Sequence, residues 1–215
     1  MVNLNNNEIG CFGHAGMGFY SSYSPNSWLG FESCLARGAD GTEMDIHMTK
    51  DSVLIITHSS NLEESTSCSG AIKDLTWTEI SDCKIKSKLF NDSKLLSLDE
   101  FIENPFVDFL QIIKDKKNDA NLFLLAEDFE EGLVQVKQSN FFGLSMNTSK
   151  ITAEQVEKAH SENIRVTIYG VLSEKENYAA IEKCPDYIQT DDLNYLLKVF
   201  EKYNRNKGFI RSLTN

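Results

Sequence analysis

The second half of the chain alternates short apolar runs with amphipathic segments, and this alternation constrains the fold more than any other feature. The runs FFGLSMN, IRVTIYGV and DYIQT have the length and apolar content of strands, whereas ITAEQVEKAHSEN and NYAAIEKC are typical of helices. Strands that alternate with helices predict a parallel sheet with helical crossovers. We therefore expect an α/β fold with its functional groups at the C-terminal ends of the strands.

The first half of the chain predicts further strands and helices. The run Ile9–Gly13 reads as a buried strand that ends at His14, and SWLGFESCLARG reads as a helix that stops at Gly38. The next two predicted strands are ADGTEMDIHMT and SVLIITH, and the tight connection between them favours a hairpin. Helices are expected after Thr76 and Ser97, because each is an N-cap residue with a glutamate three positions later.

Length and charge limit the class of protein. A chain of 215 residues with 41% hydrophobic residues suits a single domain, residues 1–215. The net charge of -11 argues against nucleic acid as a partner, because phosphate backbones are bound by basic surfaces. No apolar run approaches the roughly 20 residues of a membrane helix, so no membrane span is expected. The sequence leaves the oligomeric state open.

The cysteines and the first residues bear on the cellular compartment. The five cysteines are scattered without a C-x-x-C pair, which favours reduced thiols in a cytosol-like compartment. The first residues, MVNLNNNEIG, contain neither the basic segment nor the apolar core of a signal peptide. We therefore expect a cytoplasmic protein whose cysteines are small core or half-buried side chains.

Four titratable residues lie on or at the ends of three predicted strands. His14 closes the first strand and His58 closes the third, whereas Glu43 and Asp45 lie two residues apart on the second. Two residues apart on a strand means the same face, so the two carboxylates are expected side by side. A hard divalent cation such as Mg²⁺ or Ca²⁺ stabilises two such anions, and histidines serve as general acid and base near neutral pH. Taken alone, each of these four residues is more simply interpreted as a solvated or structural side chain.

The order of these residues resembles the glycerophosphodiester phosphodiesterase family. The resemblance rests on HAG (14–16), SPNS (24–27), GAD (38–40), EMD (43–45), TKDS (49–52) and HS (58–59), and continues through LLSLDEFIE to DYIQTDD. It covers most of the chain and is strongest over residues 9–103 and 141–192. The family implies an eight-stranded parallel TIM-type (β/α) barrel with its site at the C-terminal mouth.

The resemblance also implies an activity, the hydrolysis of a glycerophosphodiester to glycerol 3-phosphate and an alcohol in lipid and glycerol metabolism. Glu43 and Asp45 would bind the divalent metal ion, Mg²⁺ or Ca²⁺, and the metal would neutralise the phosphate. His14 and His58 would be the general acid and base. The implied partner is therefore a small glycerophosphodiester.

The sequence departs from the family pattern at several positions. Ala15 stands where the family has an arginine that meets the phosphate, and Ser59 stands where it has aspartate. The family's third acidic metal ligand has no clear equivalent, and Glu127, at the end of LFLLAED, is the best substitute. The segment from Glu103 to Phe141 is short for the strands and helices of the family. The barrel is therefore expected to be incomplete or to have fewer than eight regular β/α units.

Three other polar residues receive weaker assignments. Asn26 matches an asparagine in the family's turn before the first helix and is a candidate substrate-binding residue. His47 shares a strand face with the two carboxylates and is a second candidate, although a polar residue at the point where the strand leaves the barrel is an equal alternative. His160 lies on a helix face expected to meet solvent, and we assign it no role.

Three functions fit this sequence. The four residues His14, Glu43, Asp45 and His58 favour an active metal-dependent phosphodiesterase. The absent arginine and the short middle favour a degenerate, non-catalytic family member that binds a phosphodiester or a metal. A related phospholipase D-like enzyme would use the same groups, but it would need an apolar or basic rim that this acidic sequence does not indicate.

Overall fold

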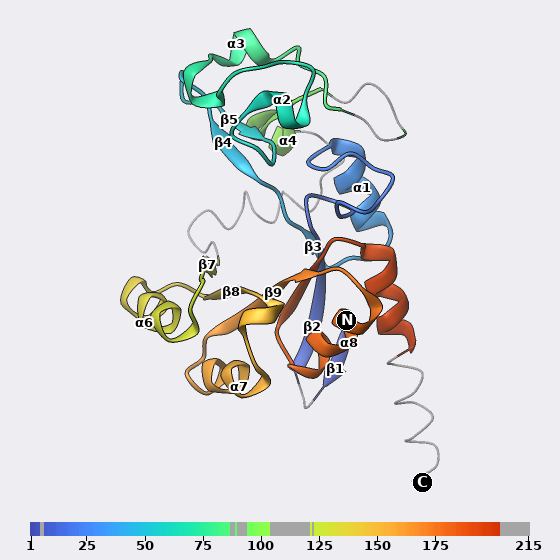
Figure 1. Ribbon diagram of the computed structural model, residues 1–215, viewed down its shortest axis with the longest axis vertical. Coiled ribbons are helices and arrows are strands. Elements are labelled where there is room, and N and C mark those ends of the chain that lie inside the picture. The colour runs from blue at the N-terminus through green and yellow to red at the C-terminus, as the bar shows by residue number, and fades with distance from the viewer. Residues whose placement is uncertain (5–6, 87–88, 90–93, 104–120, 122, 203–215) are drawn as a thin grey trace. The chain divides into compact units, whose positions relative to one another are not determined.

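The computed structural model describes the chain except for residues 5–6, 87–88, 90–93, 104–120, 122 and 203–215. The chain divides into two compact units, whose helices and strands are drawn in Figure 1. Unit 1 consists of Met1–Gly13, Ala39–Gly41 and Asn121–Asn215, and unit 2 consists of His14–Gly38 and Thr42–Ala120. Neither unit is therefore continuous in sequence.

Unit 1 is built on a mainly parallel sheet. In spatial order its strands are β1 (Val2–Leu4), β2 (Asn7–Gly13), β10 (Tyr187–Thr190), β9 (Arg165–Val171), β8 (Gly143–Asn147) and β7 (Phe123–Leu125), and β3 (Gly41–Thr42) also pairs with β2. Neighbours from β2 to β7 are parallel, whereas β1 is antiparallel to β2. Parallel strands are covered on both faces, and accordingly Leu144, Val166 and Ile188 are completely buried.

A helix follows each of the last four strands of unit 1. These helices are α6 (Phe129–Ser139), α7 (Ala153–Ser161, after the 3-10 turn Thr148–Lys150), α8 (Glu174–Glu182) and the helical residues 193–202. The first three begin after Asp128, Thr152 and Ser173, whose side chains each accept a backbone N–H of the first turn. This alternation of strands and helices confirms the predicted α/β class.

The sheet does not close on itself within the described residues. This agrees with the expected TIM-type arrangement in which the barrel is incomplete. The short middle, from Glu103 to Phe141, contributes β7 and α6, and the rest of it (104–120 and 122) lies outside the described residues. None of the described helices is long and apolar enough to cross a membrane.

His160 is half-buried and lies against the buried carboxylate of Asp186, which corrects its expected position in solvent. Its Nε2 atom lies 2.9 Å from the carboxylate of Asp186, a residue that is only 3% exposed. Arg165 Nη1, at 2.6 Å, and the backbone N–H of Val166, at 2.7 Å, donate to the same carboxylate. Burial raises the pKa of Asp186, but the hydrogen bonds from these donors outweigh burial and hold it below its usual value.

Unit 2 combines short helices with a small antiparallel sheet. The strands are β4 (Ile46–Met48), β5 (Leu54–Ile56) and β6 (Leu96–Ser97), and the helices are α1 (Trp28–Ala36), α2 (Leu62–Ser65), α3 (Trp77–Ile80) and α4 (Leu98–Glu103), with a 3-10 turn at Ile72–Asp74. The strands β4 and β5 pair as the predicted hairpin, with Ile46 opposite Ile56. Thr76 forms the predicted capping box with Glu79, and Ser97 likewise exchanges hydrogen bonds with Glu100.

The strand expected over ADGTEMDIHMT is interrupted, which is a correction to the sequence prediction. The strand β3 ends at Thr42 and β4 begins only at Ile46, so Glu43 and Asp45 lie in an irregular segment. The backbone groups of this segment bond to partners outside a regular ladder, as the N–H of Asp45 does with the side chain of Asn26. Strand parity therefore does not govern where the two carboxylates point.

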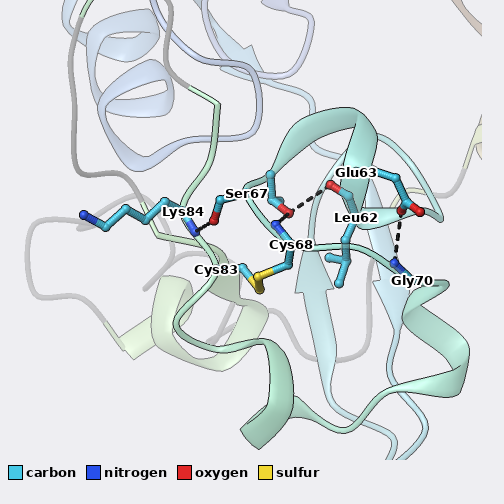
Figure 2. The surroundings of a disulfide bond; sticks show 8 residues. Leu62, Glu63, Ser67, Cys68, Gly70, Cys83 and Lys84 are labelled. Atoms are coloured by element: carbon cyan, nitrogen blue, oxygen red, sulfur yellow. Dashed lines mark hydrogen bonds between the residues drawn. A yellow bond between two sulfur atoms is a disulfide. The ribbon is translucent and has the colours of Figure 1, made fainter.

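A disulfide joins Cys68 and Cys83, with Cα atoms 5.7 Å apart, which corrects the expectation that all five cysteines are reduced. Figure 2 shows this bond beside the hydrogen bond that the Lys84 N–H donates to the Ser67 hydroxyl. Cys83 belongs to an apolar cluster with Ile55, Leu62, Ile72, Ile80, Ile85 and Leu95. The free cysteines Cys11 and Cys34 are buried and Cys184 is half-buried, as predicted for unlinked cysteines.

Candidate active site

His14 begins the tight loop that follows β2. The carbonyl of His14 accepts the N–H of Gly18 at 2.9 Å, and Ala15 and Gly16 both have positive φ angles, 49° and 101°. A side chain at Gly16 would lie 2.9 Å from the carbonyl carbon of Gly30 in α1, so this position requires glycine. The loop thereby directs the backbone N–H of Ala15 to the carboxylate of Glu43, at 3.0 Å.

Asn26 fixes the position of Asp45. Its side-chain amide donates to a carboxylate oxygen of Asp45 at 2.8 Å and accepts the backbone N–H of Asp45 at 3.1 Å. Asn26 is 2% exposed and adopts a positive φ of 55°, and its own N–H donates to the carbonyl of Ala15 at 2.9 Å. The His14 loop and the carboxylate segment are therefore tied together through Asn26, whose side chain is occupied by Asp45.

Glu43 is held close to both a histidine and a second carboxylate. Its carboxylate lies 3.9 Å from His14 Nε2. Burial raises the pKa of Glu43, and the negative charge of Asp45 raises it further, against the lowering by the Ala15 N–H and the nearby imidazoles of His14 and His58. Asp45 is thus close enough to oppose the ionisation of Glu43.

His58 lies two residues beyond β5, on the exposed side of the hairpin. The preceding residue, Thr57, is 2% exposed and donates its backbone N–H to the carbonyl of Asp45 at 2.9 Å. His47 Nε2 lies 3.4 Å from the carbonyl oxygen of His58. The predicted candidate His47 therefore contacts the backbone of His58.

The ring of Phe19 lies against both histidines. Its centroid is 4.7 Å from that of His14 and 4.9 Å from that of His58, with edge-to-face geometry in both cases, while the two imidazole centroids are 6.4 Å apart. Edge-to-face packing is a favourable arrangement for aromatic rings. Phe19 was not among the residues selected from the sequence, because nothing in its spacing distinguishes it from an ordinary loop aromatic.

A pocket of about 270 Å³ opens beside His58. Its walls combine apolar side chains with hydroxyl, amide and charged groups: Phe19, Pro25, Asn26, Ile56, Thr57, His58, Ser59, Glu64, Ser65, Ile85 and Lys86. All of these residues belong to unit 2. The predicted histidine and asparagine thus border a cavity that can hold a small molecule.

Glu127, the substitute proposed for a third metal ligand, belongs to unit 1. It is exposed at the end of β7 and forms an ion pair with Lys150. The next residue, Asp128, caps α6 by accepting the N–H of Glu131 at 3.0 Å. The role of Glu127 as a metal ligand stays a prediction.

The oxygen ligands of Glu43 and Asp45 suit a hard divalent cation. Burial and the negative charge of Asp45 raise the pKa of Glu43, and a bound cation would favour its ionised form. Mg²⁺ is commonly held by one or two carboxylates and completes its coordination with water. In the described part of the chain no group of three or more His, Cys, Asp and Glu side chains is arranged to hold a metal.

Three curated proteins share parts of this sequence. A glycerophosphodiester phosphodiesterase from Bacillus altitudinis is 40% identical over 63 residues, 29% of this chain and 26% of that protein. A glycerophosphodiester phosphodiesterase from Caldanaerobacter subterraneus is 32% identical over 121 residues, 54% of this chain and 48% of that protein. The human lysophospholipase D is 24% identical over 179 residues, 81% of this chain and 47% of that protein. The chain spans about half or less of the length of these relatives.

A solved structure supports the fold. The Oleispira antarctica phosphodiesterase, in complex with the product sn-glycerol-3-phosphate, matches with a TM-score of 0.69 at 13% identity. The match covers 89% of this chain and 96% of that chain. The α/β architecture is therefore shared with this enzyme across nearly its whole length.

The sequence model of the glycerophosphoryl diester phosphodiesterase family matches residues 17–122. This range includes Glu43, Asp45 and His58, and it starts three residues after His14. Together with the curated relatives and the shared fold, the match confirms the predicted resemblance to the glycerophosphoryl diester phosphodiesterase family.

Proposed function

We propose that the chain hydrolyses a glycerophosphodiester to glycerol 3-phosphate and an alcohol in a metal-dependent reaction. One observation carries this proposal: two imidazoles and two carboxylates from three separate segments meet in unit 2, linked through Ala15, Asn26 and Thr57. The curated relatives named as glycerophosphodiester phosphodiesterases and the product complex of the Oleispira antarctica enzyme support the choice of substrate class.

Each group in the cluster has a distinct part in this reaction. His14 and His58 hold and transfer protons, because imidazoles exchange protons near neutral pH. Glu43 and Asp45 would hold the divalent ion, and Asn26 keeps Asp45 in place. A bound divalent ion would neutralise the phosphate and stabilise the charge that develops on its oxygens. The nucleophile is either the glycerol hydroxyl of the substrate or water.

The direct test is release of glycerol 3-phosphate from glycerophosphocholine by the full chain, with Mg²⁺ or Ca²⁺ and with EDTA. We expect product that EDTA abolishes, and a loss of about two to four orders of magnitude in rate for His14→Ala and for His58→Ala. The control is His160→Ala, which removes an imidazole in the other unit. Full activity of His58→Ala would remove the acid and base assignment.

A second candidate function follows from the human relative, whose similarity extends over 81% of this chain and which is named a lysophospholipase D. Lysophosphatidylcholine is therefore offered in parallel with glycerophosphocholine. Cleavage of the lysophospholipid alone would favour this second function. Saturable binding of either diester without product under any metal would instead favour a non-catalytic family member.

A further inference from the structure

The pocket beside His58 has walls of two kinds. Phe19 and Ile56 supply apolar surface next to the imidazole, and Thr57, Ser59 and Ser65 supply hydroxyl groups. A volume of about 270 Å³ lies below the range of pockets that bury drug-sized ligands, so a small polar head group fits it better than an acyl chain.

One wall of this pocket is a built structure. It is formed by two short segments, 64–65 and 85–86, that run antiparallel and are joined by the Lys86 N–H to the carbonyl of Ser65 at 2.8 Å. Thr66 and Ile85 form an isolated bridge beside it. Just beyond, the disulfide Cys68–Cys83 links the same two segments covalently, as Figure 2 shows. The wall is therefore held together by a backbone hydrogen bond, a bridge and a disulfide.

The two charged side chains on this wall, Lys86 and Glu64, differ in their contacts. The ammonium of Lys86 donates to the backbone carbonyl of Glu63 and is held there. The carboxylate of Glu64 is exposed and has no ion pair with any residue in the described part of the chain. A cation in the pocket would meet this carboxylate and the aromatic ring of Phe19, both of which attract positive charge.

We propose that this pocket binds the leaving alcohol of the substrate and that Glu64 selects an alcohol bearing an ammonium group, such as choline or ethanolamine. This inference rests on the proposed function. In the step it describes, the nucleophile oxygen gives its proton to one imidazole of the pair His14 and His58 and bonds to phosphorus. The bond from phosphorus to the alcohol oxygen breaks, its electron pair stays on that oxygen, and the oxygen takes a proton from the other imidazole.

The test compares two diesters that share the glycerol and phosphate and differ in charge at the other end, glycerophosphocholine and glycerophosphoglycerol. Binding of each to the full chain is measured by calorimetry in the presence of Mg²⁺, and kcat/KM is measured beside it. We expect Glu64→Gln to weaken binding of glycerophosphocholine about fivefold and to leave glycerophosphoglycerol unchanged. Glu32→Gln, which removes an exposed carboxylate on α1 outside the pocket, is the matched control and should change neither.

The outcomes separate this inference from the proposed function. If the chain binds both diesters but hydrolyses neither, the proposed function fails, and the change of preference in Glu64→Gln still decides the role of Glu64. Equal weakening of both diesters, no weakening, or no binding of glycerophosphocholine by the wild-type chain would each overturn the assignment of the pocket. Glu64 is exposed, so its substitution should leave the fold intact, and circular dichroism checks this.

Discussion

Loss of the Cys68–Cys83 disulfide should lower the free energy of unfolding by about 3 kcal/mol. The bond joins cysteines 15 residues apart. Closing a loop of about 15 residues restricts the unfolded chain by about 3 kcal/mol at 25 °C. Cys83 is 2% exposed among apolar side chains, so its replacement adds a smaller loss of packing. The change to test is therefore Cys68→Ala combined with Cys83→Ala, beside the wild-type chain with a reductant.

Urea unfolding gives the measurement. We expect a reductant to lower the free energy of unfolding of the wild-type chain by about 3 kcal/mol and to have no effect on the double variant. The control is Cys34→Ala, because Cys34 is a buried free cysteine of the same unit. This control should lose stability through its cavity but keep the response to reductant. A wild-type chain that is equally stable with and without reductant would refute the reasoning.

The same bond bears on the cellular compartment. Disulfides persist mainly in oxidising compartments, so the pair Cys68–Cys83 counts against the cytoplasmic location, which stays a prediction. Alkylation of the denatured but unreduced chain, taken from its native cell, should label three of the five cysteines. Labelling of all five would instead support reduced thiols and the cytoplasm.

Two further predictions concern single side chains. Asp186→Asn should lower the free energy of unfolding by about 3 kcal/mol, because it leaves His160 and Arg165 without their buried anion. Urea unfolding measures this loss, and Asp82→Asn, at an exposed carboxylate, is the control. Since the folded pKa of Asp186 is lowered, its contribution should be present above about pH 4 and be lost as the pH falls through the folded pKa. Asn26→Ala should lower kcat/KM about 10- to 100-fold, because it releases Asp45. The control variant Asn61→Ala should leave kcat/KM unchanged. Equal activity of both variants would contradict the positioning role of Asn26.

Local sequence signals predicted the fold well where neighbouring residues decide the structure. The helix caps at Thr76 and Ser97 and the hairpin after Thr49 depend on residues a few positions apart, and a sequence displays these directly. The sequence order of His14, the two carboxylates and His58 likewise identified four residues that lie in one unit of the structure.

The features that the sequence did not predict depend on distant partners. The interruption of the strand at Glu43 arises because Ala15 and Asn26, from the first loop, bond to the carboxylate segment. The pairing of Cys68 with Cys83 depends on two loops meeting in space, and scattered cysteine spacing does not reveal it. The packing of Phe19 on His58 has the same origin, since the loop after β2 meets the loop after β5 there.

The pairing of β2 with β10 has a consequence for the order in which the protein can fold during synthesis. The strand that leads into His14 contains Cys11, and the parallel partner of Cys11 is Ile188. A ribosome must reach β10 before this partner exists, and until then β1 and β3 are the neighbours of β2 among the described strands. Pairings between such distant segments form slowly. A chain that stops before Tyr187 would carry all four residues of the cluster yet lack the strand that anchors the first of them.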